Sequence, residues 1–271
     1  MKPIKVWWQD VFPNEIINLS EETRQNYNNK IKKGLLEAAR NDTEVEMRHV
    51  KHSPYILDML YMEMLNDIWV VDGIIEAEKQ GYDAAIIGCG NDPALYEARQ
   101  AVDIPVIGLT EAALLLACSM ANKIGIVTVS EGCAAIIEER IHRYKLDSRV
   151  VYPIQVCQLQ DPILDLFKMV TEPESINPQF ENLCQKCISN GAEIIIPACA
   201  ALSPATTLAH YREVPGTGVP ILDINQVGVK AAEMQVDLLR LSGIKKSQKG
   251  LYKSIKPKVR DRMRKLAGYS S

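Results

Sequence analysis

"GYDAAIIGC" (residues 81–89) and "GAEIIIPAC" (residues 191–199) share one pattern, and this pattern decides the fold. Each stretch begins with a glycine, has an acid two residues later, continues as an apolar run and reaches a cysteine eight residues after the glycine. Each cysteine therefore stands at the end of a predicted buried strand. A helix-capping residue and a proline follow each, as Asp92-Pro93 and Ser203-Pro204. The match predicts a duplicated α/β unit.

The rest of the chain also alternates between β-rich runs and helical patterns, which predicts parallel sheets with helices on both faces. In the first half we expect strands at 4–8, 44–50, 84–88 and 105–109, with helices over about 20–40, 56–80, 93–101 and 110–121. In the second half we expect strands at 123–129, 149–154, 193–198 and 220–224, with helices over about 131–146, 161–169, 177–190, 204–212 and 225–242. The two sets match in order.

Composition narrows the class of protein. The 271 residues are 47% hydrophobic and 24% charged, which is typical of a soluble globular protein. No apolar run is long enough to cross a membrane, and the first residues, "MKPIKVWWQDVFP", lack the apolar core of a signal peptide. The seven cysteines form an odd set, so we expect free thiols and a cytoplasmic location.

The charge distribution is uneven. Residues 245–271 contain ten Lys/Arg and one acid, Asp261, whereas residues 1–244 carry a net charge of −12. This basic tail lacks interleaved aromatic residues and any nucleic-acid-binding module. We therefore expect it to fold onto the acidic body of its own chain or of a partner subunit in a homo-oligomer, and not to bind nucleic acid or a membrane.

Two cysteines carry the predicted chemistry. Ligands of open α/β sheets bind outside the carboxyl ends of the strands, so two facing lobes would place Cys89 and Cys199 across one cleft. Each cysteine precedes a predicted helix N-terminus, which we expect to lower its thiol pKa. One thiolate could then remove a proton from a carbon while the other thiol delivers a proton to the opposite face. Such an inversion of a small-molecule substrate requires no cofactor and no metal.

The carbanion formed in this way needs hydrogen-bond donors beside an adjacent carbonyl oxygen. The backbone N–H groups after each cysteine are the candidates, and Thr128, Val129 and Ser130 would complete the rim. The candidate N–H groups belong to Gly90, Asn91 and Asp92 in one lobe and to Ala200, Ala201 and Leu202 in the other.

Other motifs do not compete with this site. The sequence contains no GxGxxG, GxxxxGK[ST], HExxH or GxSxG. Cys184 and Cys187 form a CxxC, but they share a helical stripe with Phe180, Leu183 and Ile188, which favours core packing over metal binding. Cys133 follows a predicted cap, Ser130, near the cleft, and packing is the favoured interpretation for it too.

The segment "CGNDPALYEARQAVDIPVIGLTEAA" (89–113) resembles the first active-site segment of the Asp/Glu/hydantoin racemase superfamily, most closely the hydantoin/allantoin racemase branch. "KIGIVTV" (123–129) and "GAEIIIPACAAL" (191–202) extend the resemblance, which spans residues 1–243. It implies cofactor-independent racemisation with Cys89 and Cys199 as the acid/base pair. It also implies two pseudo-symmetric flavodoxin-like lobes: residues 1–115 with 224–271, and residues 116–223.

The sequence departs from this family at two places that concern the substrate. Gln9 and Asp10 follow Trp8 where relatives have an Asn-Pro-Asn-like turn that helps hold the substrate, and Ala200-Ala201 replaces the usual Ala-Gly. We expect Gln9 and Asp10 to contact substrate, with a 5-substituted hydantoin or related cyclic ureide as the favoured class. An Asp/Glu-type racemase, a maleate-isomerase-like enzyme and a non-catalytic two-lobed sensor are the alternatives.

Overall fold

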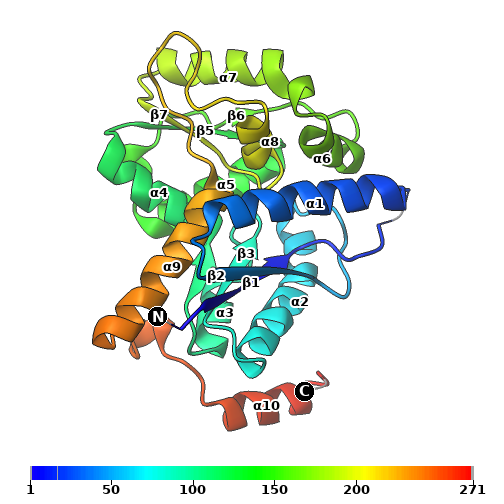
Figure 1. The fold of residues 1–271 in the computed structure, drawn as a ribbon, viewed down its shortest axis with the longest axis vertical. Coiled ribbons are helices and arrows are strands. Elements are labelled where there is room, and N and C mark those ends of the chain that lie inside the picture. The colour runs from blue at the N-terminus through cyan, green and yellow to red at the C-terminus, as the bar shows by residue number, and fades with distance from the viewer. Residues whose placement is uncertain (1, 17, 270–271) are drawn as a thin grey trace.

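Two parallel sheets form the two lobes of the computed structural model, which describes residues 2–16 and 18–269 (Figure 1). The first sheet has the order β2-β1-β3-β4, and the second has the order β6-β5-β7. Their strands are β1 (Ile4–Asp10), β2 (Thr43–His49), β3 (Ala84–Gly88), β4 (Val106–Gly108), β5 (Ile124–Thr128), β6 (Gln155–Val156) and β7 (Ile194–Pro197). The predicted α/β class with two lobes is confirmed.

Helices cover both faces of the sheets. They are α1 (Glu21–Ala38), α2 (Leu60–Lys79), α3 (Leu95–Ala101), α4 (Leu109–Met120), α5 (Glu131–Tyr144), α6 (Pro162–Thr171), α7 (Asn177–Ser189), α8 (Leu202–Leu208), α9 (Ile224–Ser242) and α10 (Pro257–Leu266). Short 3₁₀ turns lie at Asp147–Arg149, Pro173–Ile176 and Gly250–Tyr252. Among the described residues, no helix combines the length and apolar character needed to span a membrane.

Strand alternation in β1 decides which side chains reach which layer. Val6 and Trp8 pack in the core beneath α1 and α9, whereas Trp7 packs in a separate core beneath α2 and α3. The first of these cores is continuous with the second lobe, where it includes Ile126 of β5 and Ile196 of β7. The two lobes are therefore packed together through shared apolar contacts. Cys184 and Cys187 lie in the core under α7, as their helical spacing predicted.

Two predicted strands of the second lobe are much shorter than expected. In segment 149–154, only Val150 forms an isolated bridge, with Ile124, and the paired strand is Gln155–Val156. Pro153 interrupts this segment because it has no N–H group to give to a ladder. In segment 220–224, Ile221 forms a single parallel bridge with Ile195. This segment still lies beside β7, as β4 lies beside β3.

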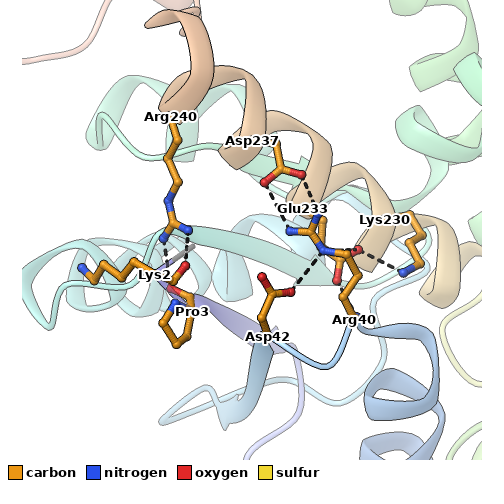
Figure 2. A network of polar contacts seen from close by, with 8 residues as sticks. All are labelled: Lys2, Pro3, Arg40, Asp42, Lys230, Glu233, Asp237 and Arg240. Carbon is orange, nitrogen blue, oxygen red and sulfur yellow. Dashed lines mark hydrogen bonds and ion pairs between the residues drawn. The ribbon is translucent and has the colours of Figure 1, made fainter.

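Helix α9 is tied to the start of the first lobe by polar contacts (Figure 2). The Arg40 guanidinium donates to both oxygens of Asp237, at 2.7 and 3.2 Å, and the Arg40 backbone N–H donates to Glu233 at 2.8 Å. Arg240 donates to two backbone oxygens just before β1, at 2.6 and 3.0 Å. Helix α9 thus packs against the start of the first lobe, far from it in sequence. The expected boundary at 115/116 falls inside α4, which packs against α9.

The basic tail folds onto the first lobe of its own chain. Arg260 is 5% exposed and donates to Glu78 at 3.2 Å and to the backbone oxygen of Ala101 at 2.6 Å. Arg264 pairs with Asp72 on α2. The described part of the tail thus neutralises part of the acidic body of its own chain, which is one of the two arrangements that the sequence left open.

We expect Arg260→Ala to lower the free energy of unfolding by about 1–3 kcal/mol, because it leaves the Ala101 carbonyl without its charged donor. Urea denaturation of the full chain measures this change. Arg262→Ala is the matched control, since Arg262 is exposed on the same helix, and we expect a change within about 0.5 kcal/mol. Equal effects of both substitutions would contradict a specific anchoring role for Arg260.

Candidate active site

A cavity of about 100 Å³ lies between the lobes, where β1, β3, β5 and β7 end. Cys89, directly after β3, and Cys199, two residues after β7, line it from opposite lobes. Of the thirteen residues predicted for the site, ten line this cavity, and Gln9, Asp92 and Leu202 do not. The ten are Asp10, Cys89, Gly90, Asn91, Thr128, Val129, Ser130, Cys199, Ala200 and Ala201. The duplicated strand ends therefore converge as the sequence predicted.

Gln9 lies outside the cavity, contrary to expectation. It is on the Trp7 face of β1, where its Oε1 accepts a hydrogen bond from Trp7 Nε1 at 2.9 Å and its Nε2 donates to the Asp10 backbone oxygen at 2.9 Å. Helix α2 closes over it at Gly73, where a Cβ would lie 1.7 Å from Gln9 Oε1. Because side chains alternate along a strand, Gln9 and Asp10 cannot both face the cleft.

Asp92 is also directed away from the cavity, and it does not cap the helix that follows Cys89. Helix α3 begins only at Leu95, and the Asp92 carboxylate instead accepts N–H groups of Thr110 (3.1 Å) and Glu111 (2.8 Å) at the start of α4. Burial raises the pKa of Asp92 to about 7.

Ser203 has a related role in the second lobe. It lies within α8, which begins at Leu202, so it does not cap that helix either. Its Oγ accepts the N–H of Ile224 at 2.8 Å, at the start of α9. Both predicted caps therefore stabilise the next helix along the chain rather than the adjacent one.

Both cysteine thiols have raised pKa values, which corrects the expectation of a lowered one. Burial raises the pKa of Cys89 well above its ordinary value, and the backbone N–H of Asn91 only partly opposes this. Burial likewise raises the pKa of Cys199, against the N–H groups of Leu202 and Ala201. Three of the six backbone donors predicted to hold a substrate oxygen, those of Asn91, Ala201 and Leu202, thus interact with the sulfur atoms. Both thiols are protonated at neutral pH.

The two cysteine turns approach each other at Gly90. A Cβ on Gly90 would lie 2.3 Å from the backbone oxygen of Ala198 and 3.0 Å from Cys199 Cα. A second close approach between the lobes occurs at Gly132 of α5, where a Cβ would lie 1.9 Å from the Asp58 backbone oxygen. Only glycine permits these two backbone contacts, which set the spacing between the lobes at the cavity.

Asn91 holds the loop that closes one side of the cavity. Its Nδ2 donates to the Leu57 backbone oxygen at 2.8 Å, and residues 55–58 all line the cavity. Its own backbone oxygen accepts a hydrogen bond from Arg140 of α5 at 3.3 Å. Arg140 also pairs with the buried Glu63 of α2 at 2.7 Å. Asn91 is therefore an organising residue at the junction of the lobes.

Asp10 is the predicted substrate contact of β1 that does reach the cavity. Its Oδ1 accepts the N–H of Phe12 at 2.9 Å, and its Oδ2 lies 3.4 Å from His49 Nδ1. Burial lowers the pKa of His49, but the contact with Asp10 outweighs this and the net shift is upward. The carboxylate is thus held in place at the cavity wall.

Sequence reasoning missed several residues of the wall. Cys133 packs against the core of the second lobe but also lines the cavity, and burial raises its pKa to about 12. Tyr27 and Ile31 of α1 line it as well, beside Leu166 of α6. The sequence shows Tyr27, Ile31 and Leu35 only as one apolar stripe of a helix, which is the signal of ordinary core residues.

The charge of the wall restricts what can bind. Among the residues that line the cavity, the charged side chains are Asp10 and Asp58, and none is Lys, Arg or His. Most of the remaining wall is apolar, with contributions from Phe12, Leu57 and Ile163 among others. This cavity suits a ligand without negative charge that carries an apolar group.

Two parallel α/β lobes with a cavity at their strand ends, and with a cysteine lining it from each lobe, are what the racemase class predicted from the sequence requires. The Asp/Glu/Hydantoin racemase family model matches residues 16–232, and the chain belongs to this family. It is therefore an isomerase of the racemase type.

Individual relatives agree with this assignment. The hydantoin racemase of Pseudomonas sp. (strain NS671) is 29% identical over 202 residues, which is 74% of this chain and 77% of the relative. An allantoin racemase from Klebsiella pneumoniae superposes with a TM-score of 0.75 at 22% identity, covering 93% of this chain and 94% of the other. Glutamate racemase RacE1 from Bacillus anthracis gives a TM-score of 0.59 at 12% identity, covering 100% of this chain and 96% of the other. The two structures share the fold with this chain.

Gly90→Ala is expected to reduce kcat/KM at least about 100-fold, because the added Cβ pushes the two cysteine turns apart and misplaces the reacting groups. Racemisation kinetics measure this loss. Gly34→Ala is the matched control: Gly34 lies in α1 with no atom within 4 Å of an added Cβ, so activity should be unchanged. Wild-type activity in Gly90→Ala would show that the close approach is dispensable.

Proposed function

We propose that this protein racemises a neutral cyclic ureide, a hydantoin with an apolar substituent at carbon 5, by a two-cysteine acid/base mechanism. The observation that supports it most directly is that Cys89 and Cys199 line one cavity from equivalent strand ends of opposite lobes. Relatives described as hydantoin racemases support the same reaction class.

The mechanism requires one thiolate and one thiol. The thiolate takes the proton from carbon 5 and becomes a thiol, while the electron pair delocalises onto the neighbouring carbonyl as an enolate. The opposite thiol then gives its proton to the other face of carbon 5 and becomes the thiolate. The substrate is inverted, and the thiolate has changed sides. The reverse reaction uses the same two groups in exchanged roles.

Deprotonation in this cavity is costly because burial raises the pKa of both thiols. The same burial makes the thiolate a stronger base, which suits the removal of a weakly acidic carbon-bound proton. The backbone N–H of Asn91 at Cys89, and those of Ala201 and Leu202 at Cys199, stabilise whichever sulfur is charged. Both sides of the cavity can therefore serve as base.

The cavity wall favours a ureide over the alternative substrates. Aspartate, glutamate and maleate carry carboxylates, whereas the charged side chains of the wall are themselves carboxylates, Asp10 and Asp58. A ureide ring offers N–H donors that a carboxylate such as Asp10 can accept. The apolar side chains from α1 and α6 would surround the substituent on carbon 5.

Wild-type protein should racemise one enantiomer of 5-benzylhydantoin in D₂O, with loss of optical rotation and incorporation of deuterium at carbon 5. Cys89→Ser and Cys199→Ser should each reduce racemisation at least about 1000-fold, since a serine hydroxyl is a far weaker acid than a thiol. Polarimetry and NMR follow the two signals. Aspartate and maleate, incubated in parallel, should show no exchange.

Cys118→Ser is the matched control for thiol loss, because Cys118 lies on α4 away from the cavity wall and its substitution should leave the rate unchanged. Full racemisation by either active-site serine variant would overturn the two-thiol mechanism. Exchange with aspartate but not with the hydantoin would overturn the proposed substrate class.

The raised thiol pKa values predict a rising pH profile. Because both thiols are protonated at neutral pH, the reactive singly ionised form becomes more abundant as the pH increases. We expect kcat/KM to rise up to about tenfold per pH unit between pH 7 and 9. Initial rates across this range, with stability checked by circular dichroism at each pH, measure the profile. A profile that is flat or falls over this range would contradict the assignment of the buried thiols as the titrating groups.

A further inference from the structure

Tyr27 is a buried phenol that faces the reacting groups of the cavity. It lies on α1, is 6% exposed and lines the cavity. Its ring packs against Phe167 of α6, with ring centroids 4.3 Å apart, so its direction is fixed by a side chain of the other lobe. Electrostatic interactions connect its hydroxyl to Asp10, Cys199 and Cys89. Tyr27, Cys89 and Cys199 thus line the same cavity.

Within residues 2–16 and 18–269, the Tyr27 hydroxyl makes no hydrogen bond, and it is not among the buried polar atoms without a partner, so it is open to the cavity that Tyr27 lines. A buried tyrosine hydroxyl normally finds a hydrogen-bond partner, because an unpaired polar group away from water costs free energy. Asp10 interacts electrostatically with Tyr27 and could accept a hydrogen bond from it, but the Asp10 oxygens are directed at the Phe12 N–H and at His49. A hydroxyl that opens into a cavity and has no partner there can donate to a bound ligand.

The proposed reaction needs a hydrogen-bond donor beside the substrate carbonyl. An enolate oxygen forms next to carbon 5, and a donor aimed at it is commonly worth a factor of 100 to 1000 in rate. The backbone N–H groups of Asn91, Ala201 and Leu202 interact with the sulfur atoms instead. The cavity wall contains no Lys, Arg or His that could take their place.

We infer that Tyr27 is a further catalytic residue, whose hydroxyl donates a hydrogen bond to the substrate carbonyl oxygen and stabilises the enolate. This inference rests on the proposed function. The proton stays on the phenol throughout, so the proton balance between the two thiols is unchanged. Burial, Asp10 and the two thiols raise the pKa of Tyr27 well above its ordinary value, which keeps it a donor at every working pH. Its position in the cavity that both thiols line allows it to serve both directions of the reaction.

Tyr27→Phe tests this role with little change in packing, because the ring that contacts Phe167 is kept. We expect kcat for 5-benzylhydantoin to fall about 100- to 1000-fold while KM changes less than threefold. The deuterium isotope effect at carbon 5 should be equal to or larger than that of wild type, since removal of the proton becomes harder. Site-specific incorporation of 3-fluorotyrosine at position 27, which keeps the hydroxyl, should restore kcat to within threefold of wild type.

Tyr82→Phe is the matched control, because Tyr82 packs against Trp7 on the other face of the first sheet and its hydroxyl contacts Glu46. Its kcat should equal that of wild type. A Tyr27→Phe kcat within threefold of wild type would overturn the catalytic role of Tyr27, and so would a loss that the fluorotyrosine variant shares. In both cases racemisation by wild type, abolished in the two serine variants, would leave the proposed function intact. Absence of racemisation by wild type would overturn both.

Discussion

The backbone contact between the turn at Gly90 and the strand end at Ala198–Cys199 is the constraint on which this site depends. An added Cβ at Gly90 would lie 2.3 Å from the backbone oxygen of Ala198, so the two duplicated turns leave no room for a side chain at Gly90. This contact places one cysteine on each side of a narrow cavity. The capping of α4 by Asp92 and the contact of Ser203 with the start of α9 fix the two turns from behind. The positions of both turns therefore depend on the starts of α4 and α9, two helices that lie further along the chain.

Helix α1 joins the lobes in a second way. It belongs to the first lobe by sequence, yet it packs on α6 of the second, where Tyr27 meets Phe167 and Lys30 donates to the Thr171 backbone oxygen at 3.0 Å. The apolar core beneath α1 is also continuous between the lobes. Any separation of the lobes would move Tyr27 relative to Cys199. The same packing that stabilises the fold thus orients the proposed enolate donor.

Burial of the two cysteines has two opposite effects on the proposed reaction. It disfavours the thiolate, because charge is costly in an apolar cavity. It also strengthens each hydrogen bond to the charged sulfur or to an enolate oxygen, because water does not compete. Among the described residues that line the cavity, the charged side chains are Asp10 and Asp58 and the rest are mostly apolar. The few hydrogen-bond donors at the sulfur atoms and at the enolate oxygen are therefore the main stabilising groups. The proposed selectivity for a neutral substrate and the proposed strong thiolate base then have one cause, the apolar wall.

The sequence by itself determined the duplicated α/β plan, both cysteines and the part of the cavity wall that the strand ends form. Each follows from local patterns: apolar runs that end at a cysteine, at matching distances from a matching glycine. Period-two alternation in β1 also contained the information that separates Asp10 from Gln9. Only the tertiary structure decided that Asp92 and Ser203 serve distant helices, that backbone donors interact with the sulfurs, and that Tyr27 faces the cavity. These are contacts between segments far apart in the chain, and a capping residue or a helical tyrosine carries no local mark of which distant partner it meets.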